Sequence, residues 1–71
     1  MMMFEITTEY IKLDSLLKGV NLVCSGGAAK EIIAEGAVRV NGELEMRRGR
    51  KLYPGDQVSV PGHGFIVERA T

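Results

Sequence analysis

Hydrophobic residues recur every three or four positions in two stretches of the first half of the chain, which is the spacing of an amphipathic helix. The first helix is predicted over residues 10–18, with Gly19 as its stop signal. The second is predicted from Ser25, a good N-cap residue, to Gly36, a good C-cap residue. The side chains expected to face the core are Leu13, Leu16 and Leu17 in the first helix and Ala29, Ile32 and Ile33 in the second.

After Gly36 the hydrophobic residues alternate with polar ones, which indicates short strands instead of helices. The pair Asn41-Gly42 predicts a type I′ hairpin turn, because such a turn requires a positive φ angle at both central positions. Pro54-Gly55-Asp56 and Gly62-His63-Gly64 mark two further turns. The predicted strands cover residues 38–40, 44–46, 57–61 and 65–68, with one more near the N-terminus over residues 2–7. Two short helices packed on a small, bent, mainly antiparallel sheet make an α+β fold.

The composition is that of one soluble domain over residues 1–71, with 45% hydrophobic and 25% charged residues. The single cysteine, Cys24, has no partner for an internal disulfide, so we expect a buried structural thiol and a reducing compartment. The apolar start lacks a basic region and is followed by Glu5, which argues against a signal peptide. No apolar run approaches the ~20 residues of a membrane span. We therefore expect a cytoplasmic monomer.

Charge is balanced over the whole chain but not along it. Nine Lys and Arg residues offset nine Asp and Glu residues, which alone argues against a nucleic-acid binder. The segment from Arg39 to Lys51, however, holds five basic residues against two acidic ones. Such a segment presents a local positive field without any global excess.

The sequence shows none of the residue patterns that carry catalysis or metal binding. It contains no nucleophile–base series, no phosphate loop and no zinc-ligand spacing. His63 lies between glycines and has no partner pattern. We therefore expect neither an enzyme nor a cofactor nor a bound metal.

A series of short motifs follows in order along most of the chain. Its members are Lys12-Leu13-Asp14 with Leu17, then Ser25, Ala29-Lys30, Ile33 and Gly36, then Val38, Val40-Asn41-Gly42 and Pro54-Gly55-Asp56. Together they resemble the S-four-type (S4-like) RNA-binding domain over residues 10–60, and most of all the stand-alone bacterial YbcJ-like proteins. The resemblance implies a helix–helix–loop unit, called the αL motif, whose second helix and following loop contact RNA.

The resemblance also implies where RNA would be contacted. Lys12, Lys30, Arg39 and Asn41 match positions of polar contacts in the family, and the basic run falls on its loop. The family usually has an arginine after the serine of the second helix, where this chain has Gly26. The implied RNA-binding residues are Lys12, Gly26, Lys30, Arg39, Asn41, Arg47, Arg48, Arg50 and Lys51, and the implied partner is structured or double-stranded RNA, such as ribosomal or transfer RNA.

Physical chemistry favours the same reading for two of these segments. Arginine forks bridge phosphate oxygens, and three Arg and a Lys within residues 47–51 can follow a curved RNA backbone. Gly26 and Gly27 at the start of the second helix would let a phosphate approach free N–H groups. Most of the four aromatic rings are expected in the core, so they would not stack on RNA bases. We therefore expect the protein to recognise the shape of folded RNA.

Several alternatives stay open at this point. The basic run can be a solvated turn, the glycines an ordinary loop into a helix, and Lys12 and Lys30 plain surface residues. Asn41 is first a turn residue and only second an RNA contact. At the level of function, the alternatives are an adaptor whose basic face meets an acidic protein partner, or an accessory subunit of an RNA-modifying enzyme.

Overall fold

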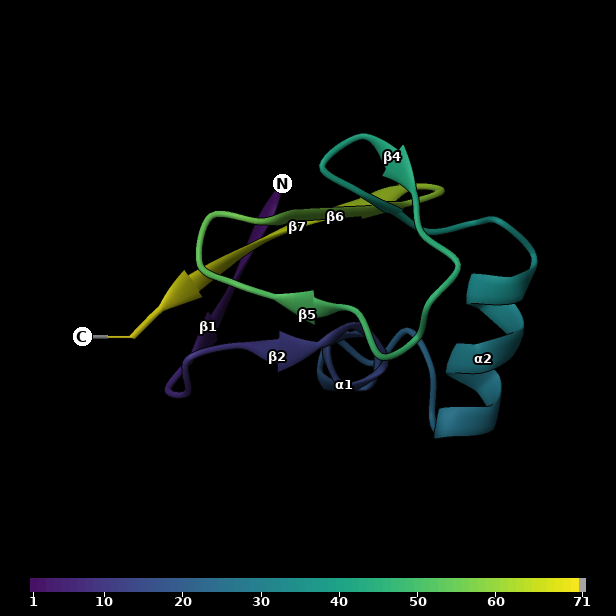
Figure 1. Ribbon diagram of the computed structural model, residues 1–71, viewed down its shortest axis with the longest axis horizontal. Helices are drawn as coiled ribbons and strands as arrows, with labels where there is room; N and C mark the ends of the chain where they lie inside the picture. Colours follow the sequence, from purple (N-terminus) through teal and green to yellow (C-terminus); the bar gives the residue numbers. More distant parts are fainter. Residues whose placement is uncertain (71) are drawn as a thin grey trace.

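The computed structural model describes residues 1–70, which form two helices and two sheets (Figure 1). The helices are α1 (Leu13–Gly19) and α2 (Gly26–Ala34). The strands are β1 (Met2–Ile6), β2 (Ile11–Lys12), β3 (Arg39–Val40), β4 (Glu43–Leu44), β5 (Lys51–Leu52), β6 (Gln57–Val60) and β7 (His63–Arg69). The predicted α+β class is confirmed.

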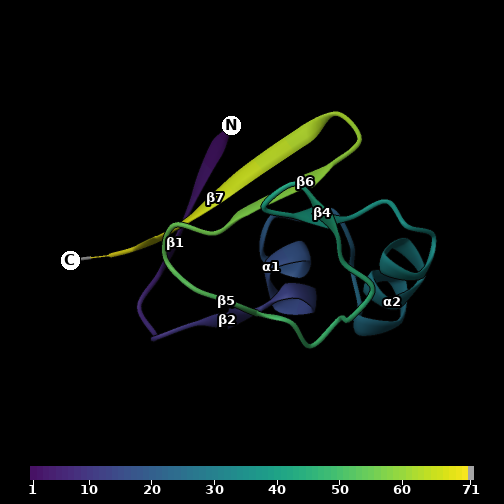
Figure 2. The same cartoon turned by 45° about the horizontal axis from the view of Figure 1, so that its top comes forward.

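A five-stranded sheet in the order β1-β7-β6-β3-β4 forms one layer. Its pairs are antiparallel except for β1 and β7, which run parallel from Met2 opposite Phe65 to Ile6 opposite Arg69. Strands β2 and β5 form a separate antiparallel pair. Figure 2 shows α1 between the sheet and this pair. The segment between β4 and β5 therefore connects the five-stranded sheet to the two-stranded one.

The core fills the space between these layers. Leu13, Leu16 and Leu17 of α1 are completely buried, as the helical spacing predicts. In α2, Ala29 and Ile33 are buried while Ile32 is only partly so. The other buried hydrophobic residues are Ile6, Val38, Val40, Leu52, Val58, Val60, Phe65 and Val67.

Helix α2 begins and ends as the sequence predicts. The hydroxyl of Ser25 accepts a hydrogen bond from the amide of Ala28 at 3.2 Å, and Gly36 has a φ of +77° just beyond the helix. Helix α1 ends at Gly19 as predicted but begins later than predicted, at Leu13. Residues 11–12 belong to β2, and the left-handed residue after the helix is Asn21, with φ +62°, instead of Gly19.

The turns confirm most of the predictions made from glycine, asparagine and proline. Asn41 and Gly42 have φ angles of +53° and +85°, as a type I′ turn requires. Gly55 has a φ of +97°, and the amide of Asp56 donates to the carbonyl of Tyr53 at 2.9 Å. The turn predicted at Gly62-His63-Gly64 is misplaced by one residue, because His63 already pairs with Val60 in the sheet.

One expectation about the thiol is wrong. Cys24 was predicted to be buried, and it is exposed in the loop between the two helices. Apolar contacts in this loop come instead from Leu22 and Val23, which pack partly against the core. A lone cysteine beside two hydrophobic residues does not reveal which of the three points inward.

Candidate nucleic-acid interface

The run Arg47 to Lys51, called the basic loop below, connects the large sheet to the β2–β5 pair. Its backbone is attached to the start of α1: the Leu13 amide donates to the Arg50 carbonyl at 2.9 Å, and the Asp14 amide donates to the Arg48 carbonyl at 3.0 Å. The first amides of a helix have no partner within the helix. The N-cap residue, Lys12, makes no side-chain capping bond. The carbonyl groups of the loop accept hydrogen bonds from these amides instead. The loop is thereby fixed in position.

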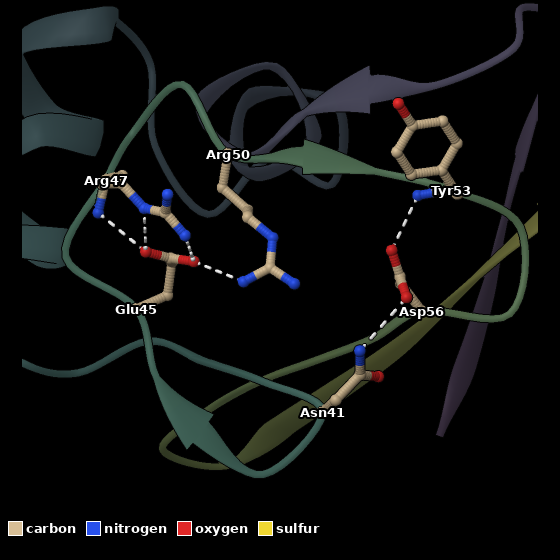
Figure 3. Close-up of polar contacts among 6 residues, drawn as sticks. All are labelled: Asn41, Glu45, Arg47, Arg50, Tyr53 and Asp56. Atoms are coloured by element: carbon tan, nitrogen blue, oxygen red, sulfur yellow. Dashed lines mark hydrogen bonds and ion pairs between the residues drawn. The ribbon is translucent and has the colours of Figure 1, made fainter.

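A buried carboxylate holds the loop from the other side. Glu45, only 5% exposed, accepts bonds from the Arg47 amide and Arg47 Nε, both at 3.1 Å, and from Arg50 Nη1 at 2.6 Å (Figure 3). These bonds, with the side-chain bonds from Arg47 first, lower the pKa of Glu45 to about 2 against the opposing effect of its burial. Glu45 is therefore ionised at neutral pH and offsets one of the positive charges of the loop.

The basic residues consequently fall into two groups. Arg47 and Arg50 are engaged with Glu45, although 75% and 33% of their side chains stay exposed. Arg48 is exposed, and no ion pair to its guanidinium occurs within residues 1–70. Lys12 and Lys51 are also exposed and stand opposite each other in the β2–β5 register. The β2–β5 pairing therefore places Lys12 beside the end of the basic loop.

An open hollow lies along the basic loop. It has a volume of about 780 Å³ and is lined by Arg47, Gly49, Arg50, Lys51 and Tyr53. Three of its five lining residues are cationic, so it attracts anions. The other side chain that lines the hollow is the aromatic ring of Tyr53.

The exposure of that ring corrects a prediction. Aromatic residues were expected to be mostly in the core, yet Tyr53 is 43% exposed, and Tyr10 is only partly buried. Their rings lie 5.9 Å apart at 48°, and Lys51 Nζ is 4.9 Å from the centre of the Tyr10 ring, within cation–π range. Phe4 and Phe65 do contribute to the interior. A stacking surface thus exists next to the cations.

Asn41 is engaged as a turn residue. Its Nδ2 donates to Asp56 Oδ1 at 3.1 Å, and its Oδ1 accepts from the Gln57 amide at 2.9 Å. Asp56 also accepts from the Tyr53 amide through Oδ2 at 2.8 Å (Figure 3). Both polar atoms of the Asn41 amide group therefore connect the β3–β4 turn to the start of β6, and the RNA role of Asn41 stays a prediction.

Three predicted site residues lie away from the hollow. Arg39 is exposed between buried Val38 and Val40, so strand alternation turns it away from the core. It donates to the Gly42 carbonyl at 3.4 Å and lines a smaller hollow beside Pro61. Gly26 and Lys30 belong to the first turns of α2. The structure therefore brings Lys12 and the basic loop together, while the RNA contacts of Gly26, Lys30 and Arg39 stay predictions.

Sequence reasoning missed Glu45 and Asp56, the two carboxylates that organise the site. The proline–glycine–aspartate turn was recognised, but a bond from Asp56 to Asn41, 15 residues away, has no local signature. Glu45 was counted as a charge that merely reduced the local excess. Glu45 precedes Arg47 by two residues and Arg50 by five, so its closeness in sequence to both arginines was the available signal.

Other kinds of site find no support in the described part of the chain. Residues 1–70 hold no group of three or more His, Cys, Asp or Glu side chains able to bind a metal ion. Neither helix has the length and apolarity needed to cross a membrane.

The fold agrees with the comparisons to known proteins. The model of the S4 domain family matches residues 4–68. The chain belongs to the S4 domain family, as its motifs predicted. Over 59 residues it is 49% identical to "Probable ribosome maturation protein RlbA" of Bacillus subtilis (strain 168), with 83% of each chain covered. Over 58 residues it is 43% identical to "Putative RNA-binding protein YbcJ" of Escherichia coli (strain K12), with 82% of this chain and 83% of YbcJ covered.

A solved structure gives the same result. The solution structure of YbcJ from Escherichia coli superimposes with a TM-score of 0.72 at 38% identity, covering 96% of this chain and 87% of YbcJ. That structure is described as revealing an αL motif involved in RNA binding.

Proposed function

We propose that this chain is a non-catalytic, cytoplasmic RNA-binding module that grips the phosphate backbone of structured RNA through Lys12 and the basic loop. The observation that carries the proposal is the attachment of the loop to α1 and Glu45, which leaves Arg48, Lys12 and Lys51 exposed on a fixed backbone. A fixed array of cations loses little conformational freedom when it binds, which favours affinity. Phosphate contacts supply most sequence-independent affinity for nucleic acids.

The names of the relatives support the RNA as the partner. YbcJ is named as an RNA-binding protein and RlbA as a ribosome maturation protein. Ribosomal RNA is accordingly the first RNA to test, before transfer RNA. Gly26, Lys30, Arg39 and Asn41 remain proposed contacts of lower rank than the loop, because their positions are separate from the hollow or their polar atoms are already used.

The first prediction tests this grip by removing charge from residues that have no structural bond to lose. We expect Lys12→Gln combined with Arg48→Gln to weaken binding to a short RNA hairpin. The slope of log K against log salt concentration should fall by about 2, because each lost phosphate contact reduces it by about 1. The measurement is a titration of labelled hairpin at several salt concentrations.

The matched control is Lys18→Gln combined with Arg69→Gln. It also removes two positive charges, but from exposed residues outside the loop and its hollow. This control should keep the slope of the parent, and thermal melts should show both doubles folded. Equal slopes in the two double variants would show that net charge, not the loop, governs binding. Arg50→Glu is unsuitable, because it would place a second carboxylate against buried Glu45.

A further inference from the structure

Tyr53 is placed where a nucleic-acid base could reach it. In β5, Leu52 is completely buried and Lys51 is exposed, and Tyr53, directly after the strand, is exposed as well. Burying an aromatic ring is normally favourable, and here 43% of the residue faces solvent. The same residue forms one wall of the open hollow along the basic loop, beside Arg50 and Lys51.

One contact orders the backbone of Tyr53 and another its ring. Asp56 Oδ2 accepts from the Tyr53 amide at 2.8 Å, which fixes the backbone at the end of β5. Tyr10 packs against the ring at 5.9 Å and is itself covered by Lys51. A held ring loses little freedom when a partner stacks on it.

The rest of the lining determines what that partner is. Arg50 uses Nη1 for Glu45, and a third of its side chain remains exposed, while Lys51 is exposed beside Tyr53. A free phosphate or a regular duplex backbone would contact these cations and leave the ring unused. A single nucleotide has both the flat apolar base and the phosphate that the hollow is lined to receive. Base faces are accessible only in loops, bulges and ends, because a duplex buries them in its own stack.

We propose that the hollow receives one unpaired nucleotide of a structured RNA, with its base stacked on Tyr53 and its phosphate held by Lys51 and Arg50. The inference rests on the proposed function and adds the class of RNA: a helical stem that carries a bulged or terminal unpaired nucleotide. The stem contacts Lys12 and Arg48, and the unpaired nucleotide enters the hollow.

The second prediction concerns Tyr53 and uses two RNAs that differ by one nucleotide. One is a perfect hairpin stem, and the other carries a single bulged nucleotide in the same stem. We expect the parent to prefer the bulged RNA. Tyr53→Ala should lose about 5-fold to 150-fold in affinity for it, the range of base–aromatic stacking, with little change for the perfect stem. Tyr53→Phe should bind both RNAs like the parent, because it keeps the ring.

A second readout does not depend on any variant folding. A bulged 2-aminopurine loses fluorescence when it stacks, so the parent protein should quench it. The matched control for Tyr53→Ala is Met3→Ala, which also shortens an exposed apolar side chain but lies on β1.

The outcomes separate the two proposals. If the parent binds both RNAs equally, leaves 2-aminopurine unquenched and tolerates Tyr53→Ala, the nucleotide site is overturned while the phosphate grip stands. If the parent binds neither RNA, both proposals are overturned, and the hollow is then to be tested with protein partners. Quenching, a preference for the bulge and its loss in Tyr53→Ala together support the site.

Discussion

Glu45 and Asp56 decide how the polar side chains around them are used. Glu45 takes up hydrogen bonds from two arginines, and Asp56 joins the Tyr53 amide to the Asn41 side chain. Buried or half-buried carboxylates of this kind need partners, because an unpaired charge away from water costs several kcal/mol. These bonds use part of the donor capacity of Arg47, Arg50 and Asn41. Binding in the loop consequently depends most on Arg48, Lys12 and Lys51.

The third prediction concerns Glu45→Gln. The glutamine keeps one acceptor oxygen but loses the charge and turns an NH₂ group toward the guanidinium groups. We expect the free energy of unfolding at pH 7 to fall by about 1.5–3 kcal/mol, the range of a hydrogen bond to a charged group. The measurement is urea unfolding, with Glu43→Gln on exposed β4 as the matched control, which should change it little.

The pH dependence follows from the direction of the shift. The folded pKa of Glu45 is about 2, below its ordinary value of 4.5. Its charge therefore contributes stability that is fully present above about pH 4.5 and is lost as the pH falls toward 2. We expect the stability difference between the parent and Glu45→Gln to shrink over that window. A stability difference that is constant from pH 7 to pH 2 would show that the charge of Glu45 does not stabilise the fold.

At the scale of secondary structure elements, α2 begins with two glycines that the structure leaves uncovered. Gly26 is not among the residues with a positive φ angle, and a Cβ placed there would meet no atom within 4 Å. Gly27 would meet only the Ser25 hydroxyl at 3.8 Å, an ordinary contact. The backbone therefore does not require glycine at either position, and the reason for the bare helix start lies outside the fold.

The fourth prediction separates two such reasons. Gly26→Ala should leave the helix as stable or more stable, by up to ~1 kcal/mol. If free amides at this end contact a phosphate, the added methyl group should weaken RNA binding, and Gly26→Arg should weaken it too. If Gly26 instead marks the loss of an arginine contact, Gly26→Arg should tighten binding. Titrations at one salt concentration, with thermal melts, distinguish these outcomes, and parental affinity in both variants would exclude the helix start from recognition.

The same scale shows what the sequence can and cannot predict. Helices, hairpin turns and most strands follow from local signals such as the Ser25 cap and Asn41-Gly42, and they are confirmed. The β2–β5 pair is not predictable in this way, because residues 11–12 and 51–52 meet across the chain and are too short for a period to show. That unseen pairing is also why the exposure of Tyr53 and the position of Lys12 beside Lys51 were missed.

At the scale of the whole molecule, the structure separates the parts that fold the chain from the parts proposed to bind RNA. The chain extends 34 × 23 × 18 Å, and α1 lies between the sheet and the strand pair that carries Lys12 and Lys51 (Figure 2). Strand β1 is at the opposite edge of the large sheet from β4, after which the basic loop begins. Changes in β1 should therefore affect stability without affecting the grip.

The last prediction tests that separation with Ile6→Ala. Ile6 is 5% exposed and belongs to the core cluster. Its carbonyl accepts a hydrogen bond from the Ala70 amide at 2.8 Å, which extends the pairing of β1 with β7. Truncating a buried isoleucine costs about 2–5 kcal/mol. For a domain of this size the loss corresponds to a fall in Tm of roughly 10 °C or more, out of a modest total stability. Met3→Ala, on the same strand but 62% exposed, should melt within a few degrees of the parent.

RNA affinity provides the decisive second measurement. At a temperature where Ile6→Ala is still folded, it should bind the hairpin with the affinity and salt slope of the parent, because Ile6 lies on β1, at the opposite edge of the sheet from β4. A loss of affinity in a demonstrably folded Ile6→Ala would mean that the loop geometry depends on the far edge of the sheet. Parental affinity with a lowered Tm would show that α1 and Glu45 suffice to hold the loop, since these are the groups to which it is bonded.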